Sequence, residues 1–180
     1  MAIAQRLDPL EPSVNSGSAY VLYLAHDYEK SIGYCRRAIE RDDQYAVAHA
    51  LLGWDDVQVK RYPEAIVELK RALALAPENS LYLATLGRAE VLAGQNAEAD
   101  HVLQQLDEVG KHKWVGASTK AIIYTAKNDR EQALRSLEDA QKQEDWFMLW
   151  LKVTPEFDPL RDDVRFQKLV ERAGPPSGIQ

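Results

Sequence analysis

The chain has 180 residues, of which 46% are hydrophobic and 28% charged, a balance typical of globular rather than disordered proteins. The formal net charge of -6 argues against a dedicated nucleic-acid binder, because such a protein carries a basic surface stripe. A single cysteine excludes an internal disulfide framework, and the chain lacks the ~20 apolar residues in a row that span a membrane, so we expect a cytoplasmic protein.

Apolar residues recur at helical spacing between short clusters of turn residues, which predicts helices joined in pairs. Pro63 suits the first turn of a helix, and Asn79 suits an N-cap. Gly94 and Gly110 suit left-handed helix ends. The helices that we expect cover residues 12–26, 28–41, 46–60, 63–75, 80–94, 97–109, 114–127, 130–142 and 163–173.

The pattern returns with a period of about 34 residues. The columns that repeat are Ser31, Ala65, Ala99 and Ala133; Cys35, Leu69, Leu103 and Leu137; and Ala38, Ala72, Leu106 and Ala140. The pair Leu52-Gly53 returns as Leu86-Gly87. Antiparallel helices pack about 8–10 Å apart, and their closest approaches accept only small side chains. We therefore interpret the small columns as helix contacts within each hairpin and the larger residues as contacts between hairpins.

This register divides the chain into segments. They are the tail of a truncated leading repeat (1–11), four repeats (12–45, 46–79, 80–113 and a degenerate 114–147), a C-terminal cap (148–174) and a flexible tail (175–180). The start inside a repeat indicates either a fragment of a longer array or an unusual natural start. The apolar cluster at residues 146–151 is interpreted as covering the last hairpin. The alternative is a docking element for a partner or a second copy.

No pattern points to catalysis or to a metal. The four histidines lack metal-ligand spacing such as H-E-x-x-H. Cys35 falls in an apolar column, which favours an inert buried thiol. The carboxylates of Asp55 and Asp56 diverge by about 100° on a helix and do not converge on one ion. A Gly-rich phosphate loop is absent from the sequence. We predict a protein that is not an enzyme and has no cofactor and no metal.

The period and the motifs resemble the tetratricopeptide repeat (TPR) family. Tyr62-Pro63-Glu64-Ala65 is similar to the family's turn and helix entry, and the stretch from Ala72 to Pro77 is similar to its exit. The resemblance extends to about Lys142. It implies an all-α fold, a right-handed superhelix (α-solenoid) of about four helix hairpins with a C-terminal capping helix. Residues 150–166 resemble the closing segment of bacterial multidomain signalling proteins, which implies the sensory or regulatory part of such a protein.

The resemblance also implies a function: in this family the first helix of each hairpin lines a concave groove that binds a peptide or helix of a partner protein. By register, the groove residues here are Tyr20, Tyr23, Trp54, Val57, Arg88, Val91 and Ile122. The lysine and asparagine clamp for a terminal carboxylate is missing, since Ser16, Ala50 and Ala84 occupy its positions. Two alternatives stay open. The aromatic residues can instead pack against neighbouring helices, or the chain can form a homo-oligomer through uncovered solenoid ends near Ile3 and Leu7.

Overall fold

The computed structural model describes residues 11–173, and every regular element within that range is helical. The all-α prediction is therefore confirmed. The α-helices are α2 (Pro12–Leu24), α3 (Tyr28–Arg41), α4 (Ala46–Gln58), α5 (Tyr62–Leu75), α6 (Ser80–Leu92), α7 (Asn96–Gly110), α8 (Ala117–Ala126), α9 (Arg130–Lys142) and α10 (Val164–Ala173). Two short 3-10 helices, η1 (Trp146–Trp150) and η2 (Pro155–Leu160), precede α10.

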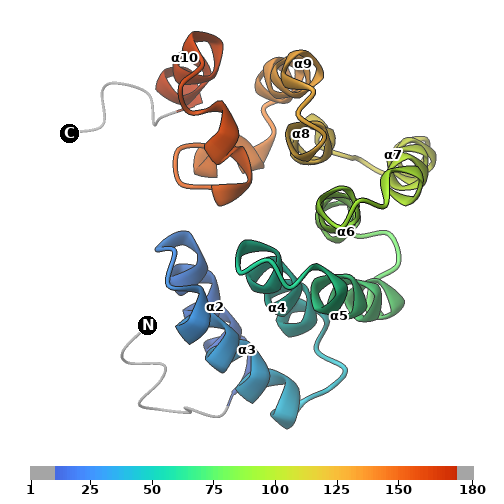
Figure 1. Ribbon diagram of the computed structural model, residues 1–180, viewed down its shortest axis with the longest axis vertical. Helices are drawn as coiled ribbons and strands as arrows, with labels where there is room; N and C mark the ends of the chain where they lie inside the picture. The colour runs from blue at the N-terminus through green and yellow to red at the C-terminus, as the bar shows by residue number, and fades with distance from the viewer. Residues whose placement is uncertain (1–10, 174–180) are drawn as a thin grey trace.

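Consecutive helices from α2 to α9 pack as four hairpins, which follow one another along an arc (Figure 1). The first helices α2, α4, α6 and α8 lie on the inner side of the arc, and their partners lie outside. Helix α4 is buried from Ala48 to Val57 because it packs against both its own partner and the neighbouring hairpins. The segment from η1 to α10 continues the arc, so that the C-terminal part of the chain comes round to face α2.

The repeat is visible in the backbone itself. The second residue after each inner helix has a positive φ: 61° at His26, 63° at Lys60, 82° at Gly94 and 58° at Asn128, each 34 positions after the last. The next N–H bonds back to the helix, as from Asp27 to the Leu22 carbonyl at 2.9 Å. This is the Schellman helix end. The left-handed end predicted at Gly94 is confirmed, whereas the one predicted at Gly110 is wrong, because α7 continues through that residue.

The small residues of the repeat mark close approaches between helices. Ser31, Ala65, Ala99 and Ala133 are all fully buried. A Cβ atom added at Gly53 would lie 2.6 Å from Leu69 Cγ, and one at Gly87 would lie 2.8 Å from Ile123 Cδ1. The repeated glycine thus leaves room for a side chain of a packed helix, Leu69 of α5 at Gly53 and Ile123 of α8 at Gly87.

The fourth hairpin starts later than predicted. Its first helix begins at Ala117 rather than near residue 114, after an extended Gly116. The Asp145 carboxylate holds this start, since its Oδ2 accepts bonds from the Ser118 hydroxyl at 2.6 Å and from the Ser118 N–H at 3.2 Å. Trp114 is therefore left in a loop with most of its side chain exposed.

The C-terminal segment has an apolar core of its own, built against α8 and α9. The Phe157 ring is fully buried and lies 6.3 Å from the Phe147 ring and 6.2 Å from the Phe166 ring. Arg165 on α10 bonds to Glu131 and Glu138 on α9 at 2.7 and 2.9 Å. The segment is thus a packed part of the solenoid rather than a loose extension of it.

Candidate interaction surface

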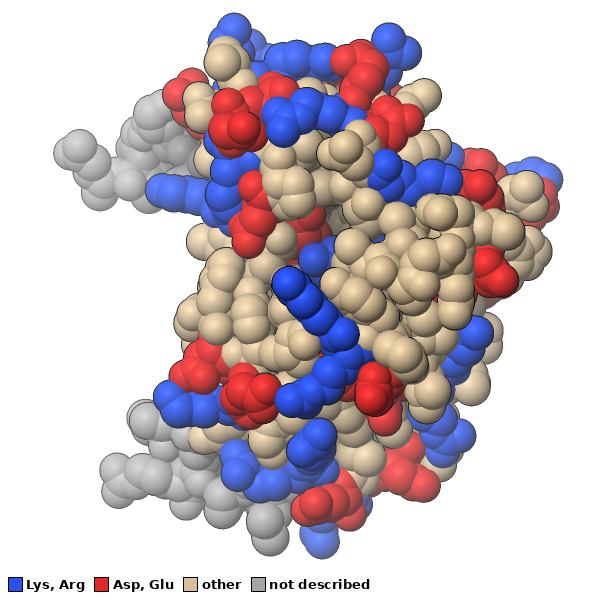
Figure 2. Space-filling view, viewed as in Figure 1, with Lys and Arg blue, Asp and Glu red and all other residues tan. Residues whose placement is uncertain are grey.

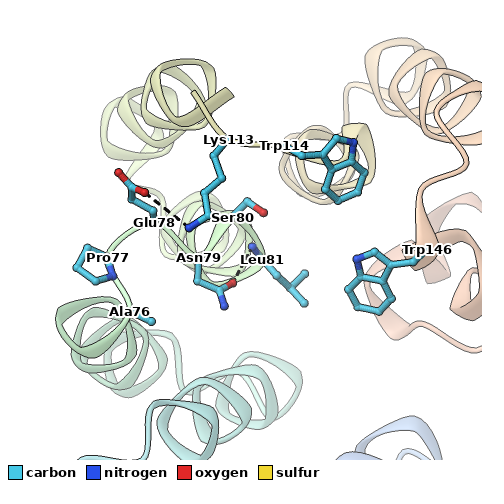
Figure 3. A pocket seen from close by; sticks show the side chains of 9 residues that line it. All are labelled: Ala76, Pro77, Glu78, Asn79, Ser80, Leu81, Lys113, Trp114 and Trp146. Carbon is cyan, nitrogen blue, oxygen red and sulfur yellow. Dashed lines mark hydrogen bonds and ion pairs between the residues drawn. The ribbon is translucent and has the colours of Figure 1, made fainter. Parts of the chain in front are cut away.

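All four tryptophans of the chain line two adjoining hollows on the inner side of the arc. The first hollow, of about 450 Å³, is lined among others by Ser16, Tyr20, Tyr45, Trp54, Trp146 and Trp150. The second, of about 690 Å³, is lined by residues 76–81 together with Lys113, Trp114 and Trp146 (Figure 3). Asn79, Leu81 and Trp146 line both. We call the residues lining the two hollows the tryptophan groove.

Three of these tryptophans are far more exposed than large apolar side chains usually are. Trp114 is 57% exposed, Trp146 53% and Trp150 38%. Tyr20 lies between the two sides of the first hollow, edge-on to Trp54 at 6.3 Å and to Trp150 at 6.0 Å between ring centroids. An exposed apolar patch of this kind marks an interaction site in a soluble protein.

The tryptophan groove is close to neutral. Among the described residues no charged side chain lines the first hollow, and only Glu78 and Lys113 line the second. These two pair with each other, Lys113 Nζ to Glu78 Oε2 at 3.6 Å. Figure 2 shows uncharged surface over part of the middle of the molecule, crossed by Lys or Arg side chains and bordered by charged residues of both signs. The groove therefore suits a ligand segment without net charge.

Asn79 connects the two hollows because it begins α6. Its side-chain Oδ1 accepts bonds from the N–H groups of Leu81 at 3.1 Å and Tyr82 at 3.2 Å, which confirms the predicted N-cap. The amide nitrogen is consequently turned away from the helix (Figure 3). The Ala76–Glu78 loop lies on one side of this asparagine, and the Trp114 and Trp146 rings lie on the other.

A second cluster lies deeper, where η2 meets the inner helices. The Tyr23 hydroxyl donates a 2.7 Å bond to Glu156 Oε1, and Gln58 Nε2 donates a 3.0 Å bond to the Tyr23 oxygen. Burial, with the Glu156 charge adding to it, holds the pKa of Tyr23 well above its usual value, and the Arg88 charge opposes that rise. We call Tyr23, Gln58, Arg88 and Glu156 the central polar cluster.

The structure separates the residues predicted to form one groove. Tyr20 and Trp54 line the tryptophan groove, although Trp54 is itself 92% buried, with 8% exposed. Tyr23 and Arg88 lie in the central polar cluster. Val91 is half-buried against the apolar core that includes Leu69 and Leu86. Whether any of them contacts a partner stays a prediction.

Five of the residues predicted to line an open groove are buried in the structure: Tyr23, Trp54, Val57, Arg88 and Ile122. Of these five, only Trp54 lines one of the two hollows. Ile122 packs in the core that contains Phe157, and Tyr23 bonds to Glu156, because the C-terminal segment folds onto the inner helices. The register identified the inner helices but gave no sign of what covers them.

Sequence reasoning left out Trp114, Trp146 and Trp150 from the groove. For Trp146 and Trp150 the sequence does carry a signal, the apolar cluster at residues 146–151. That cluster is interpreted above as a cap or, alternatively, as a docking element. Trp114 was placed inside a helix by the register, although it lies in the loop before α8.

Comparisons with known proteins agree with this architecture. Residues 57–113 match the tetratricopeptide repeat family. The crystal structure of YrrB, a TPR protein with an unusual peptide-binding site, is similar with a TM-score of 0.57 and 17% sequence identity, covering 96% of this chain and 89% of that one. The fold is thus a helix-hairpin solenoid of the TPR type.

Other classes of site find no support within the described part of the chain. Residues 11–173 contain no group of three or more His, Cys, Asp or Glu side chains placed to hold a metal ion. Within the same range no helix combines the length and apolar character that crossing a membrane requires.

Proposed function

We propose that this protein is a non-catalytic interaction module that binds a peptide segment of a partner protein in the tryptophan groove. The observation that carries the proposal is that all four tryptophans line one neutral surface, three of them largely or partly exposed. Tryptophan and tyrosine dominate binding hot spots because they bury a large area with few rotatable bonds.

The fold adds support. A TPR solenoid presents its inner helices as a preformed concave surface, so little ordering is needed when a ligand binds. YrrB, which shares the fold, has a peptide-binding site. We extend the proposal to cytoplasmic signalling, with this chain as the sensory or regulatory part of a larger bacterial protein, on the resemblance of residues 150–166 to the closing segment of such proteins.

The test is peptide selection followed by substitution. Peptides selected from a random displayed library on the full chain should bind wild type and lose at least tenfold in affinity to Trp146→Ala and to Tyr20→Ala. Leu149→Ala is the matched control, because Leu149 is 69% exposed on the same 3-10 helix but does not line the groove. Selected peptides that bind the folded Trp146→Ala and Tyr20→Ala variants as well as wild type would refute the proposal.

Self-association through the solenoid ends, the alternative to binding a peptide in the groove, stays a prediction. Ile3 and Leu7, on which it rested, lie outside the described residues. Light scattering at increasing concentration tests it on the same samples, since a strict monomer counts against it. Peptide binding by a monomer would leave the groove proposal standing alone.

A further inference from the structure

The indole and amide groups that line the tryptophan groove offer hydrogen-bond donors, while its Ser and Tyr hydroxyls can both donate and accept. An indole N–H only donates, and Asn79 has only its amide N–H groups left because Oδ1 is engaged by the start of α6. The one carboxylate in the lining, Glu78, already bonds to His112 at 3.1 Å and pairs with Lys113. A ligand that matches this lining brings acceptors.

Two buried groups among the residues of the first hollow have no hydrogen-bond partner within residues 11–173. Ser16 Oγ and Trp54 Nε1 lack a hydrogen bond, and both residues are more than nine-tenths buried. A buried polar group without a partner costs about 1–3 kcal/mol. Both atoms are themselves shielded, so a ligand in the first hollow reaches them only if neighbouring side chains move.

The conformation of a peptide decides which hydrogen-bonding groups it presents. A helix uses its carbonyls internally, and a β-strand brings an N–H with nearly every carbonyl. A polyproline II segment rich in proline has no N–H at its prolines, leaves its carbonyls free and presents apolar rings. Aromatic-lined grooves bind such segments, which are preordered and therefore lose little entropy on binding.

We propose that the tryptophan groove recognises an uncharged, proline-rich segment in the polyproline II conformation. This inference rests on the proposed function and names the chemical class of its ligand. The proline rings stack on Trp114, Trp146 and Trp150, and the carbonyls accept bonds from indole and Asn79 N–H groups. The segment passes from one hollow to the other at Asn79 and Trp146, which line both. The absence of net charge in the lining matches the absence of charge in the ligand.

The probe is an acetylated and amidated ten-proline peptide, about 31 Å long as a polyproline II helix. Its binding to the full chain is followed by intrinsic tryptophan fluorescence, because every indole lies in or beside the site. A Gly-Ser peptide and an uncharged amphipathic helical peptide of the same length are the comparison ligands. We expect the oligoproline to bind at least tenfold more tightly than either of them.

Two substitutions assign this binding to the groove. Trp146→Ala should weaken oligoproline binding at least tenfold, and Leu149→Ala should leave it unchanged. Asn79→Asp keeps the helix cap, since aspartate caps as well as asparagine, but removes the amide donor, and should weaken binding several-fold. Trp114→Ala, in an exposed loop, replaces Trp146→Ala if that variant does not fold.

The outcomes separate this inference from the function on which it rests. Oligoproline that binds no better than the Gly-Ser peptide, or that binds the tryptophan variants equally well, overturns the inference. If library-selected peptides without proline still depend on Trp146, the groove binds peptides of another conformation and only the ligand class is wrong. If no selected peptide depends on Trp146 or Tyr20, the proposed function fails with it.

Discussion

The Tyr23 hydroxyl donates a 2.7 Å hydrogen bond to the Glu156 carboxylate, which joins α2 to η2 across 133 positions of sequence. The rings of Tyr20 and Trp150 make a second contact, between α2 and η1. In an open solenoid each repeat contacts only its neighbours. Here the C-terminal segment contacts the first hairpin as well as the last one, so the two ends of the array stabilise each other.

Removing this bond should destabilise the whole array. In Tyr23→Phe the buried Glu156 carboxylate loses the partner of Oε1, and its Oε2 already has none. A buried acceptor left unpaired costs about 1–3 kcal/mol. We expect the free energy of unfolding, measured by urea titration, to fall by this amount.

Tyr20→Phe is the matched control on the same helix. Within the described residues the Tyr20 hydroxyl makes no hydrogen bond, so its loss should change stability by less than about 0.5 kcal/mol. Equal effects of the two substitutions would show that the bond to Glu156 contributes nothing.

Two glycines inside helices, Gly53 and Gly33, give a second prediction. Replacing them by alanine should change the free energy of unfolding in opposite directions. Gly53→Ala places a methyl group against the buried Leu69 side chain, and such overpacking costs about 1–3 kcal/mol. Gly33 lies inside α3 with no atom within 4 Å of an added Cβ. Gly33→Ala should therefore stabilise by about 0.5–1 kcal/mol, the difference in helix propensity.

Thermal unfolding of the two glycine variants measures both signs in one experiment. The melting temperature should fall in Gly53→Ala and rise in Gly33→Ala, with about 2–4 °C for each 1 kcal/mol. A rise in both would mean that Leu69 moves aside at no cost and that the close approach is not what selects the glycine.

Asp55 is a fully buried carboxyl, and no cationic side chain in the described part of the chain bonds to it. The Ser31 hydroxyl lies 2.6 Å from Asp55 Oδ2 and 2.9 Å from the Ala19 carbonyl oxygen. It has one hydrogen, so both bonds form together only when Asp55 is protonated and donates to Ser31. Desolvation by burial raises the pKa of Asp55 from 3.8 to about 8, although its hydrogen bonds with Ser31 and Cys35 oppose the rise.

This raised pKa makes stability depend on pH. Between pH 3.8 and about 8 the folded protein keeps a proton that the unfolded chain releases, so the stabilisation is complete below pH 3.8 and is lost as pH rises through 8. Asp56, whose pKa burial raises to about 6, acts in the same direction. We expect the melting temperature to fall by several degrees between pH 5 and pH 9.

Asp55→Asn should reduce that decline, because asparagine keeps a donor toward Ser31 and cannot ionise. Asp107→Asn is the control, since Asp107 is an exposed partner of Lys120, and it should leave the decline as in wild type. Two results would contradict a protonated Asp55. One is a wild-type melting temperature that does not change with pH in this range, and the other is a decline that Asp55→Asn leaves unchanged.

Local signals in the sequence predicted most of the solenoid. The bounds expected for α3 and α9, residues 28–41 and 130–142, are those observed, because turn residues and apolar spacing act within one hairpin. The cap at Asn79 was also predicted, since it depends on residues only two and three positions away.

The candidate site was predicted only in part, because it depends on contacts between distant residues. Tyr23 was placed on an open groove, but a bond across 133 positions buries it, and no local pattern encodes that pairing. Trp114 lies in a loop because Asp145 holds the start of α8 at Ser118. The surface containing three exposed tryptophans exists only once η1 has folded against the inner helices.

The four left-handed ends of the inner helices give a last prediction. Three of them carry a side chain, at His26, Lys60 and Asn128, whereas Gly94 does not. A left-handed residue with a Cβ atom is strained by roughly 1–2 kcal/mol, and glycine avoids this strain but loses more entropy on folding. Lys60→Gly should therefore stabilise by up to about 1 kcal/mol.

The reverse change should destabilise by a similar amount. In Gly94→Ala the added Cβ has no atom within 4 Å, so the cost comes from the backbone alone, at about 1 kcal/mol. Urea unfolding of the two variants measures both effects. If Gly94→Ala is as stable as wild type, the turn accepts a Cβ without strain, and the period of positive φ values reflects hairpin geometry rather than a residue preference. If it is less stable and Lys60→Gly is more stable, the repeat tolerates a strained residue at three of its four turns because the Schellman bonds outweigh the strain.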